Sequence, residues 1–339
     1  WNDCIQFVIY VLGGIAAVFV IANQIPGSWG ALVEFIQQHN KLQLFEFWPS
    51  SNDAAAEVAP SLFGRWLISD THGFWASLIG GAFLTIGTHG TDQMMVQRYL
   101  SARSQSDAAW ALGLSGFVVC LQFALFLFIG VELAAFFSFH PEIELGRPDE
   151  IFAQFIVDWF PANTGLIGLL LAAILAAAMS TLSSSLNSSA SALMNDIYLP
   201  RLKAQGKEPT TAKLLAVSRR LAVGFGLLQI AIGIAAQSLD RTVVASALTI
   251  AGFSSGLLLG AFSLALFVRR AQAAHVLLGM LCGLAMLLAV HFLLPYWQWR
   301  VAYQWYALIG MTITLVCGIL ASYAFPKSTR QNQTANEAP

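Results

Sequence analysis

The sequence carries very little charge. Only 10% of its 339 residues are Asp, Glu, Lys or Arg, whereas soluble globular domains average about 25%. The formal net charge is −1, so the sequence lacks the basic excess with which nucleic-acid-binding proteins neutralise phosphates. Most of the sequence is apolar instead, with 57% hydrophobic residues. This composition predicts a protein that crosses a lipid bilayer several times and does not bind nucleic acid.

Cysteines are few, and signals of an enzyme are missing. The four cysteines all lie in apolar stretches, and their spacing matches neither a disulfide framework nor a zinc site. The apolar stretches contain no catalytic pair and no cluster of metal-ligating residues, so the sequence does not favour an enzyme. The chain begins with Trp1 and enters an apolar stretch at once, without the regions of a signal peptide. We therefore expect it to be the C-terminal part of a longer protein.

Eight apolar stretches are long enough to cross a bilayer core of about 30 Å, which needs roughly 20 helical residues. All eight are expected to be helices, because an open strand cannot satisfy its backbone hydrogen bonds in lipid. The expected spans are approximately 3–23, 73–97, 110–137, 163–194, 214–236, 243–268, 273–294 and 303–325. The predicted fold class is an all-α polytopic membrane protein, with 1–339 forming a single transmembrane domain.

The distribution of basic residues predicts how these spans are oriented. Loops on one side hold twelve Lys and Arg residues, and loops on the other side hold five. By the positive-inside rule the first side is cytoplasmic, so both chain ends are expected in the cytoplasm and the spans in the inner (plasma) membrane. Residues 24–72 then form a long extracytoplasmic loop, in which 29–36 is apolar enough for a short helix. Residues 326–339 form a polar cytoplasmic tail.

A run of hydroxyl side chains interrupts the fourth apolar span. Ser180 and Thr181 follow Ala177 by three and four residues, so the three share one face of a helix. The hydroxyls and a carbonyl of this single turn offer oxygen ligands to a hard cation such as sodium. Hydroxyl side chains also form hydrogen-bonded seams between membrane helices. Both interpretations remain open on the residues alone.

The second span is rich in glycine and threonine. These residues are Gly80, Gly81, Thr85, Gly87, Thr88, Gly90 and Thr91. Transporters interrupt helices near the membrane midplane so that free backbone groups meet the substrate, and this composition permits such a break. Small residues also allow close packing of continuous helices, so the composition does not decide between the two.

Four ionisable residues lie within the spans or at their ends. They are Asp3, Asp92, Glu132 and Asp196. An ionisable side chain inside a membrane span is a candidate functional residue. The alternative at each position is a salt bridge or a helix-end residue at the membrane interface.

Three motifs stand in a defined order along the chain. They are Trp1-Asn2-Asp3-Cys4-Ile5-Gln6, the run from Gly90-Thr91-Asp92-Gln93 to Ser101-Ala102-Arg103, and Met179-Ser180-Thr181-Leu182-Ser183-Ser184 with the following Asn187-Ser188 and Asp196-Ile197-Tyr198. In sequence, order and spacing they resemble the sodium:solute symporter family, which transports sugars, proline, vitamins and sialic acid with sodium. The resemblance covers essentially the whole chain.

The resemblance implies a fold. The family has a five-plus-five inverted repeat of helices, like the leucine transporter, with additional flanking helices. On that map the first expected span is core helix five, the next five are core helices six to ten, and the last two are C-terminal additions. The resemblance therefore implies that core helices one to four precede this chain in the same polypeptide and are its structural partners.

The resemblance also implies where sodium, the co-transported ion, binds. The family's shared sodium site maps onto the Ala177 carbonyl and the Ser180 and Thr181 hydroxyls, with its remaining ligands on the absent first core helix. Relatives that resemble sialic acid carriers have a second sodium site. That second site maps onto Asp3, Ser180, Ser183 and Ser184.

The substrate positions depart from those of the sugar transporters in the family. Where those members place an Asn and a Tyr-Trp pair on core helix six, this chain has Thr85, Thr88 and His89. Where they place a Gln on core helix ten, it has Leu248. These four residues are the candidate substrate contacts, and they lack the aromatic stacking and amide donors that sugars use. An organic acid, an amino acid or a modified sugar therefore remains open.

The function expected from the resemblance is sodium-coupled symport of a small organic solute by alternating access. Sodium on the fourth span would favour the outward-open state and order the substrate site. Asp3 would line the inner exit of sodium, and Asp92 and Arg98 would help to form the inner gate. The alternative is a membrane-embedded solute sensor of the same fold, because some relatives are fused to signalling domains.

Overall fold

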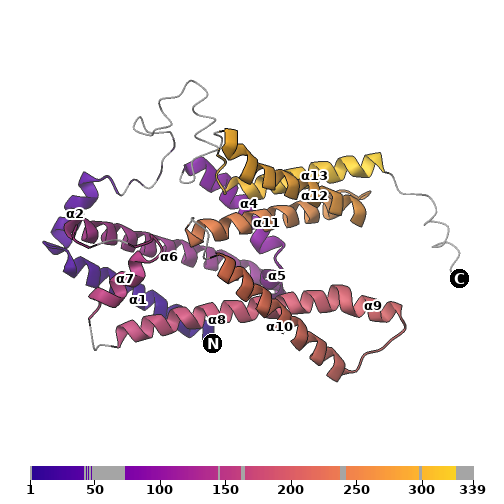
Figure 1. The fold of residues 1–339 in the computed structure, drawn as a ribbon, viewed down its shortest axis with the longest axis horizontal. Coiled ribbons are helices and arrows are strands. Elements are labelled where there is room, and N and C mark those ends of the chain that lie inside the picture. The colour runs from indigo at the N-terminus through magenta and orange to yellow at the C-terminus, as the bar shows by residue number, and fades with distance from the viewer. Residues whose placement is uncertain are drawn as a thin grey trace. The chain divides into compact units, whose positions relative to one another are not determined.

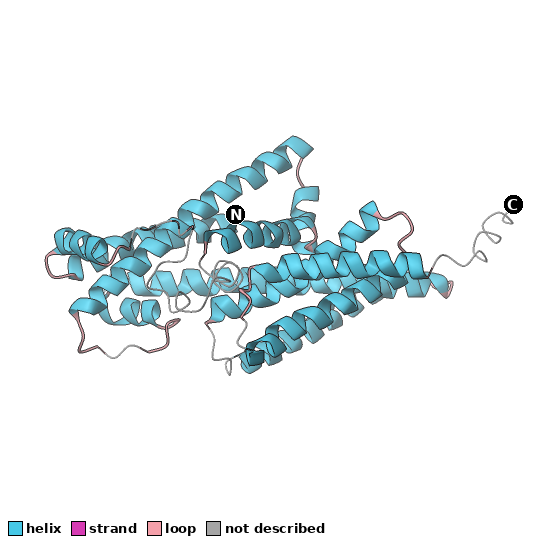
Figure 2. Cartoon of the chain, turned by 90° about the horizontal axis from the view of Figure 1, so that it is seen from above, coloured by secondary structure: helices cyan, strands magenta, loops and turns pink. Residues whose placement is uncertain are grey.

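The computed structural model describes residues 2–41, 43, 45, 47, 73–143, 146–161, 165–236, 242–297 and 300–325, with only the backbone of Asn2 and Asp3. Across these residues the regular structure is helical, and they form no strand (Figures 1 and 2). Seven helices in this described part are long and apolar enough to cross a membrane. The chain divides into two compact units. Unit 1 comprises Trp1–Gln43 and Gln97–Thr242, and unit 2 comprises Leu44–Val96 and Val243–Pro339.

Unit 1 is built on long membrane helices with shorter helices at their ends. Its long helices are α1 (Asn2–Gln24), α6 (Gln105–Phe139), α8 (Leu166–Leu193) and α10 (Thr211–Ala236). Its shorter elements are α2 (Ser28–Gln38), α7 (Ile151–Trp159), a π-helical turn (Met194–Tyr198) and α9 (Leu199–Ala204). Helix α1 packs against α6 and α8, and α10 packs against α8.

The connection between α1 and α2 shows how the sequence sets this unit's local structure. Gly27 has a φ of 88°, a left-handed conformation that costs glycine little because it has no side chain. The chain can therefore reverse at once into α2, which buries Leu32, Phe35 and Ile36. The short helix expected at 29–36 is confirmed.

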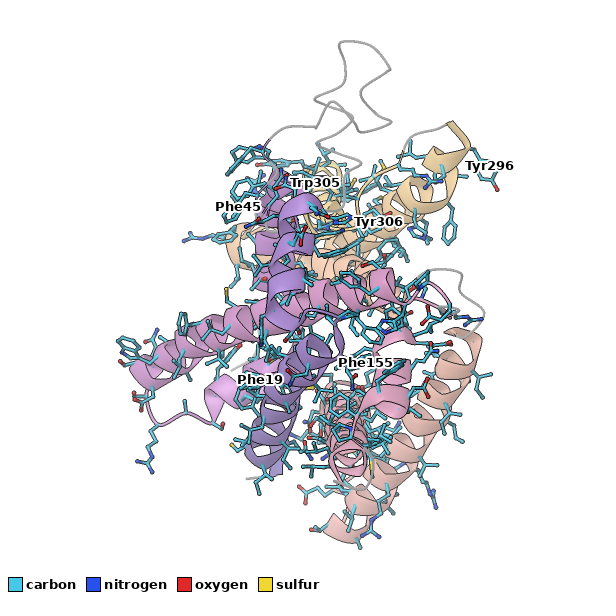
Figure 3. All side chains as sticks on the ribbon, turned by 90° about the vertical axis from the view of Figure 1, so that its left-hand side faces the viewer. Phe19, Phe45, Phe155, Tyr296, Trp305 and Tyr306 are labelled. Atoms are coloured by element: carbon cyan, nitrogen blue, oxygen red, sulfur yellow. The ribbon has the colours of Figure 1, made fainter. Side chains whose placement is uncertain are left out.

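The core of unit 1 lies where α1, α2, α6, α7 and the first turns of α8 meet. Phe136 of α6 and Phe155 of α7 are both fully buried and pack edge to face, with ring centroids 5.0 Å apart and an interplanar angle of 83°. Phe155 is labelled in Figure 3. Ile21 of α1 and Leu32 of α2 belong to the same apolar cluster. This cluster fixes one end of α6 against the helices on either side.

Unit 2 contains three closely packed helices, α11 (Val243–Phe267), α12 (Ala273–Leu288) and α13 (Trp305–Ala324). Small residues permit the close approach. A Cβ placed on Gly256 would lie 2.7 Å from the carbonyl oxygen of Ala307, and one on Gly260 would lie 2.6 Å from the Cβ of Thr314. Membrane helices associate largely through such backbone contacts, since lipid is as apolar as their side chains.

Unit 2 also contains the segment from 73 to 96, which is not one continuous helix. A π-helical turn (Ala76–Gly80) leads into α4 (Gly81–Gly90), and α5 (Gln93–Leu100) begins after a break at Thr91 and Asp92. The Thr91 hydroxyl donates to the Gly87 carbonyl at 2.7 Å, which ties the end of α4. Close packing through small residues is confirmed, because Gly80 and Gly87 lie against Gln304 and Ser255. A break that meets a substrate near the midplane stays a prediction.

The structure can be compared with the eight predicted spans. Seven of them correspond to helices of membrane-spanning length, including α8, which continues through the π-helical turn into α9 at Ala204. The span predicted over 73–97 is not one continuous helix, because the chain leaves the helical conformation at Thr91 and Asp92. Residues 48–72 of the long loop and the tail 326–339 lie outside the described residues.

Candidate functional site

The hydroxyl run lies on α8, whose first residue follows Gly165 in a left-handed conformation with a φ of 75°. The helix continues without interruption through Ala177 and Thr181. The Thr181 hydroxyl donates to the Ala177 carbonyl with an oxygen–oxygen distance of 3.0 Å. Two of the three atoms assigned to the shared sodium site are therefore adjacent on one face of the helix.

The exposure of these residues decides what they can contact. Thr181 and Ser183 are exposed in the described structure, whereas Ala177, Ser180 and Ser184 are half-buried. A hydroxyl that already donates to a carbonyl still carries lone pairs that accept. The Thr181 oxygen is thus positioned by its own helix, on an exposed residue, and can still accept.

One edge of the hydroxyl run forms the seam that the sequence allowed as an alternative. Ser185, one turn after Thr181, accepts a hydrogen bond from the Gln229 amide of α10 at 3.0 Å. Gln229 was not predicted from the sequence as part of this site, although a single amide side chain within an apolar span could have indicated it. On the side that faces α10 the run is therefore hydrogen-bonded through Ser185, one turn after the Ala177–Thr181 pair.

Asp3 of α1 was predicted to join a second sodium site with α8. Helices α1 and α8 run in opposite directions (Figure 1), and a Cβ on Gly13 of α1 would collide with the Leu170 side chain of α8. Asp3 lies ten residues before Gly13 on α1, and Ser180 lies ten residues after Leu170 on α8. At 1.5 Å per residue both lie about 15 Å from the contact point along their helices. The register thus directs the Asp3 backbone toward the level of Ser180.

The candidate substrate residues Thr85, Thr88 and His89 lie in the last turns of α4. The Thr88 hydroxyl donates to the Leu84 carbonyl at 3.0 Å, and the His89 Nδ1 lies 3.1 Å from both the Thr85 carbonyl and the Thr88 hydroxyl. These contacts tie the polar side chains to carbonyls near the broken end of α4. They orient the His89 ring along its own helix.

Leu248, the fourth candidate substrate residue, is half-buried on α11. Helix α11 packs against α4, and the helices meet where Gly87 faces Ser255. Leu248 lies seven residues before Ser255, which is about two helical turns. The structure therefore places Leu248 on the helix beside the threonines, at a distance of about two turns from the contact point.

The candidate gate residues flank the start of α5. Asp92 precedes that helix, and its carboxylate accepts from the Met94 backbone N–H at 2.7 Å. This is the hydrogen bond of a helix N-cap, so Asp92 has a structural role whether or not it belongs to a gate. Arg98 is exposed on α5. Asp92 belongs to unit 2 and Arg98 to unit 1.

The helices and polar positions described above define a membrane-embedded, all-helical protein. The model of the sodium:solute symporter family matches residues 1–283, and the chain belongs to this family. Family and relatives are transporters, not enzymes.

Two curated relatives illustrate the similarity. The chain is 30% identical over 293 residues to the sodium-dependent multivitamin transporter of Oryctolagus cuniculus, covering 84% of this chain and 42% of that protein. It is 27% identical over 299 residues to the human sodium/iodide cotransporter, covering 86% of this chain and 42% of that protein. The chain thus spans less than half the length of these relatives.

A solved structure shares the fold. It is described as the substrate-bound outward-open state of a Na+-coupled sialic acid symporter with a novel Na+ site. The TM-score is 0.72 with 24% identity, over 97% of this chain and 62% of that chain. At this identity the match supports the fold of the chain and leaves its residues to be argued individually.

Proposed function

We propose that this chain is part of a sodium-coupled symporter that moves a small organic solute across a membrane by alternating access. The observation that carries the proposal is the adjacent pair of oxygens, from Ala177 and Thr181, on a face of α8 where Thr181 is exposed. The family of the chain supports sodium as the coupled ion.

The shared sodium site would use the Ala177 carbonyl and the Ser180 and Thr181 hydroxyls. A sodium ion held there needs further oxygen ligands, which the proposal places on the first core helix, in the part of the polypeptide preceding this chain. The ion would then join α8 to that helix in one conformation and release it in another. Coupling requires this difference, because an ion with equal affinity for both conformations shifts neither. Each positive charge moved gains about 2.3 kcal/mol per 100 mV of membrane potential.

A second sodium is proposed between α1 and α8. The equal spacing of Asp3 and Ser180 from the Gly13–Leu170 contact supports it, and Ser183 and Ser184 lie within the next turn. Replacing Ser184 by Ala in the intact protein should reduce the number of sodium ions moved per solute from two to one. Parallel measurements of sodium and solute flux test this. A one-to-one ratio in the unaltered protein, unchanged by Ser184→Ala, would remove the second site.

The proposed solute is a small carboxylic acid. Relatives are named as multivitamin, monocarboxylate and iodide transporters, and the similar solved structure carries sialic acid. Thr88 and His89 already bond to carbonyls of their own helix, so the Thr85 hydroxyl is proposed to donate to the carboxylate. None of the three side chains has a stacking surface as large as that of Trp. Asp92 and Arg98 are proposed to lie at the inner gate. We also propose that the protein lies in the inner (plasma) membrane with both chain ends in the cytoplasm.

The test is uptake by the intact protein reconstituted in liposomes. An inward sodium gradient should drive accumulation of a radiolabelled monocarboxylate above its equilibrium level, and an equal potassium gradient should not. Equal uptake of every tested solute under both gradients would contradict the proposal. The alternative of a sensor has no support among the relatives, which are named as transporters and cotransporters.

A further inference from the structure

A buried carboxyl group lies in unit 1, away from the hydroxyl run of α8. Glu132 lies on α6, seven residues before that helix ends at Phe139. Its side chain is 0% exposed. Neither carboxylate oxygen has a hydrogen-bond partner in the described structure. An ionisable residue within a membrane span without a partner needs an explanation.

The surroundings of Glu132 are apolar. One turn away on the same helix are Ile129 and Phe136, which belong to the buried cluster of unit 1. Helices α1 and α2 pack against this helix and add Ile21 and Leu32 to the cluster. The buried side chains beside Glu132 along α6, and those that α1 and α2 add to the same cluster, are therefore hydrocarbon.

The titratable groups on these helices are engaged elsewhere or exposed. The Tyr10 hydroxyl of α1 donates to Gln122 at 2.7 Å, and exposed Glu34 of α2 accepts from Gln38 at 3.0 Å. The rings of His39 and His140 each lie within 3.0 Å of a carbonyl of their own helix. The other described groups on these helices, Cys4, Asp107, Cys120 and Asp158, are exposed, and the Asp3 side chain lies outside the described residues. None of the described groups supplies a hydrogen bond to Glu132.

The form of the carboxyl group follows from its cost of burial. An ionised carboxylate among apolar side chains, without a donor or a counter-charge, is far more costly than a neutral acid. A sodium ion would need several oxygen ligands, which this cluster of side chains does not offer. A proton needs only the one carboxyl oxygen to which it binds.

We propose that Glu132 is a proton-binding site, occupied in the conformation described here. The proton forms an O–H bond with one carboxyl oxygen, and the group stays neutral while α1, α2, α6 and α7 enclose it. If water reaches the carboxyl group when these helices separate, the proton passes to that water and the carboxylate is solvated. Proton concentration is thereby linked to the packing of this part of unit 1.

Infrared spectroscopy of the full chain in lipid nanodiscs tests the proposal at pH 7, where exposed glutamates are ionised. The Glu132→Gln variant should lose a protonated-carboxyl band and leave the carboxylate bands unchanged. The matched control Glu34→Gln, at an exposed position on α2, should lose carboxylate intensity and leave the protonated-carboxyl region unchanged. If Glu132→Gln loses carboxylate intensity instead of the protonated-carboxyl band, Glu132 is ionised and the proposal is wrong.

A second measurement uses stability and does not require the glutamine variant to fold. Unfolding would let Glu132 ionise and release its proton, so a rise in pH favours the unfolded state. Melting of the unaltered chain should therefore shift to lower temperature from pH 5 to pH 8. The apolar variant Glu132→Leu, which has no proton to release, should show a smaller shift. Equal shifts in the unaltered chain and in Glu132→Leu would overturn the proposal.

Discussion

Helix α8 of unit 1 and the α11–α13 bundle of unit 2 both place small and hydroxyl residues within apolar spans, but with opposite results. In the bundle, Gly256 and Gly260 bring backbones together, and Thr314 is fully buried. On α8, the Thr181 and Ser183 side chains remain exposed. The glycines that recur every four residues on α11, Gly252, Gly256 and Gly260, lie closest to Tyr306, Ala307 and Thr314 on α13. The run on α8 contains hydroxyl side chains where the bundle has glycine, and it does not draw a neighbouring backbone onto Thr181 and Ser183.

The largest effect is expected in the closely packed α11–α13 bundle. The variant Gly256→Ala places a Cβ 2.7 Å from the Ala307 carbonyl oxygen and should destabilise the chain by about 1–3 kcal/mol through overpacking. Thermal unfolding in detergent measures it. The control is Gly224→Ala on α10, where a Cβ meets nothing within 4 Å. Equal thermal stability of the two variants would mean that the bundle accommodates the added methyl group.

A smaller effect concerns the break between α4 and α5. Replacing Asp92 by Ala removes the hydrogen bond to the Met94 N–H and should cost about 1 kcal/mol. Asp92→Asn keeps an acceptor at this cap and should keep the stability. If Asp92 also serves the inner gate through its charge, Asp92→Asn should slow uptake by the intact protein while it melts normally. Normal uptake by Asp92→Asn would limit the residue to capping.

The smallest effect sharpens the comparison within α8 itself. A double-mutant cycle of Ser185→Ala and Gln229→Leu should give a coupling energy of about 0.6 kcal/mol, typical of hydrogen bonds between membrane helices. Equilibrium unfolding of the four proteins measures it. A cycle of Thr181→Ala with Gln229→Leu should show no coupling. Similar coupling in both cycles would mean that the hydroxyl run acts as one seam toward α10.

The sequence predicted the parts of the fold that depend on composition and periodicity. Long apolar runs determine α6, α8 and α10, and the three- and four-residue spacing alone placed Ala177, Ser180 and Thr181 on one face. The break at Thr91 and Asp92 depends on which side chains capture backbone groups, and a hydropathy pattern does not contain that information. The Ser185–Gln229 bond required knowledge of which helices are neighbours.

Burial was the least predictable property. Glu132 lies near the end of its span, where an interface residue was an equally reasonable expectation, and its complete burial follows from the packing of α1 and α2 onto α6. The register that relates Asp3 to Ser180 is read from the close contact of Gly13 with Leu170. Contacts between distant segments decide both cases, and local sequence does not specify them.

The sodium dependence of uptake by the intact protein with Thr181→Ala tests the role of α8 most directly. Loss of one ligand oxygen should raise the sodium concentration for half-maximal uptake about tenfold, equivalent to about 1.4 kcal/mol. Thr181→Ser keeps the hydroxyl, and Ser185→Ala removes only the hydrogen bond to Gln229. Both variants should need about the same sodium concentration for half-maximal uptake as the unaltered protein. An unchanged sodium dependence in Thr181→Ala would contradict sodium binding at this face.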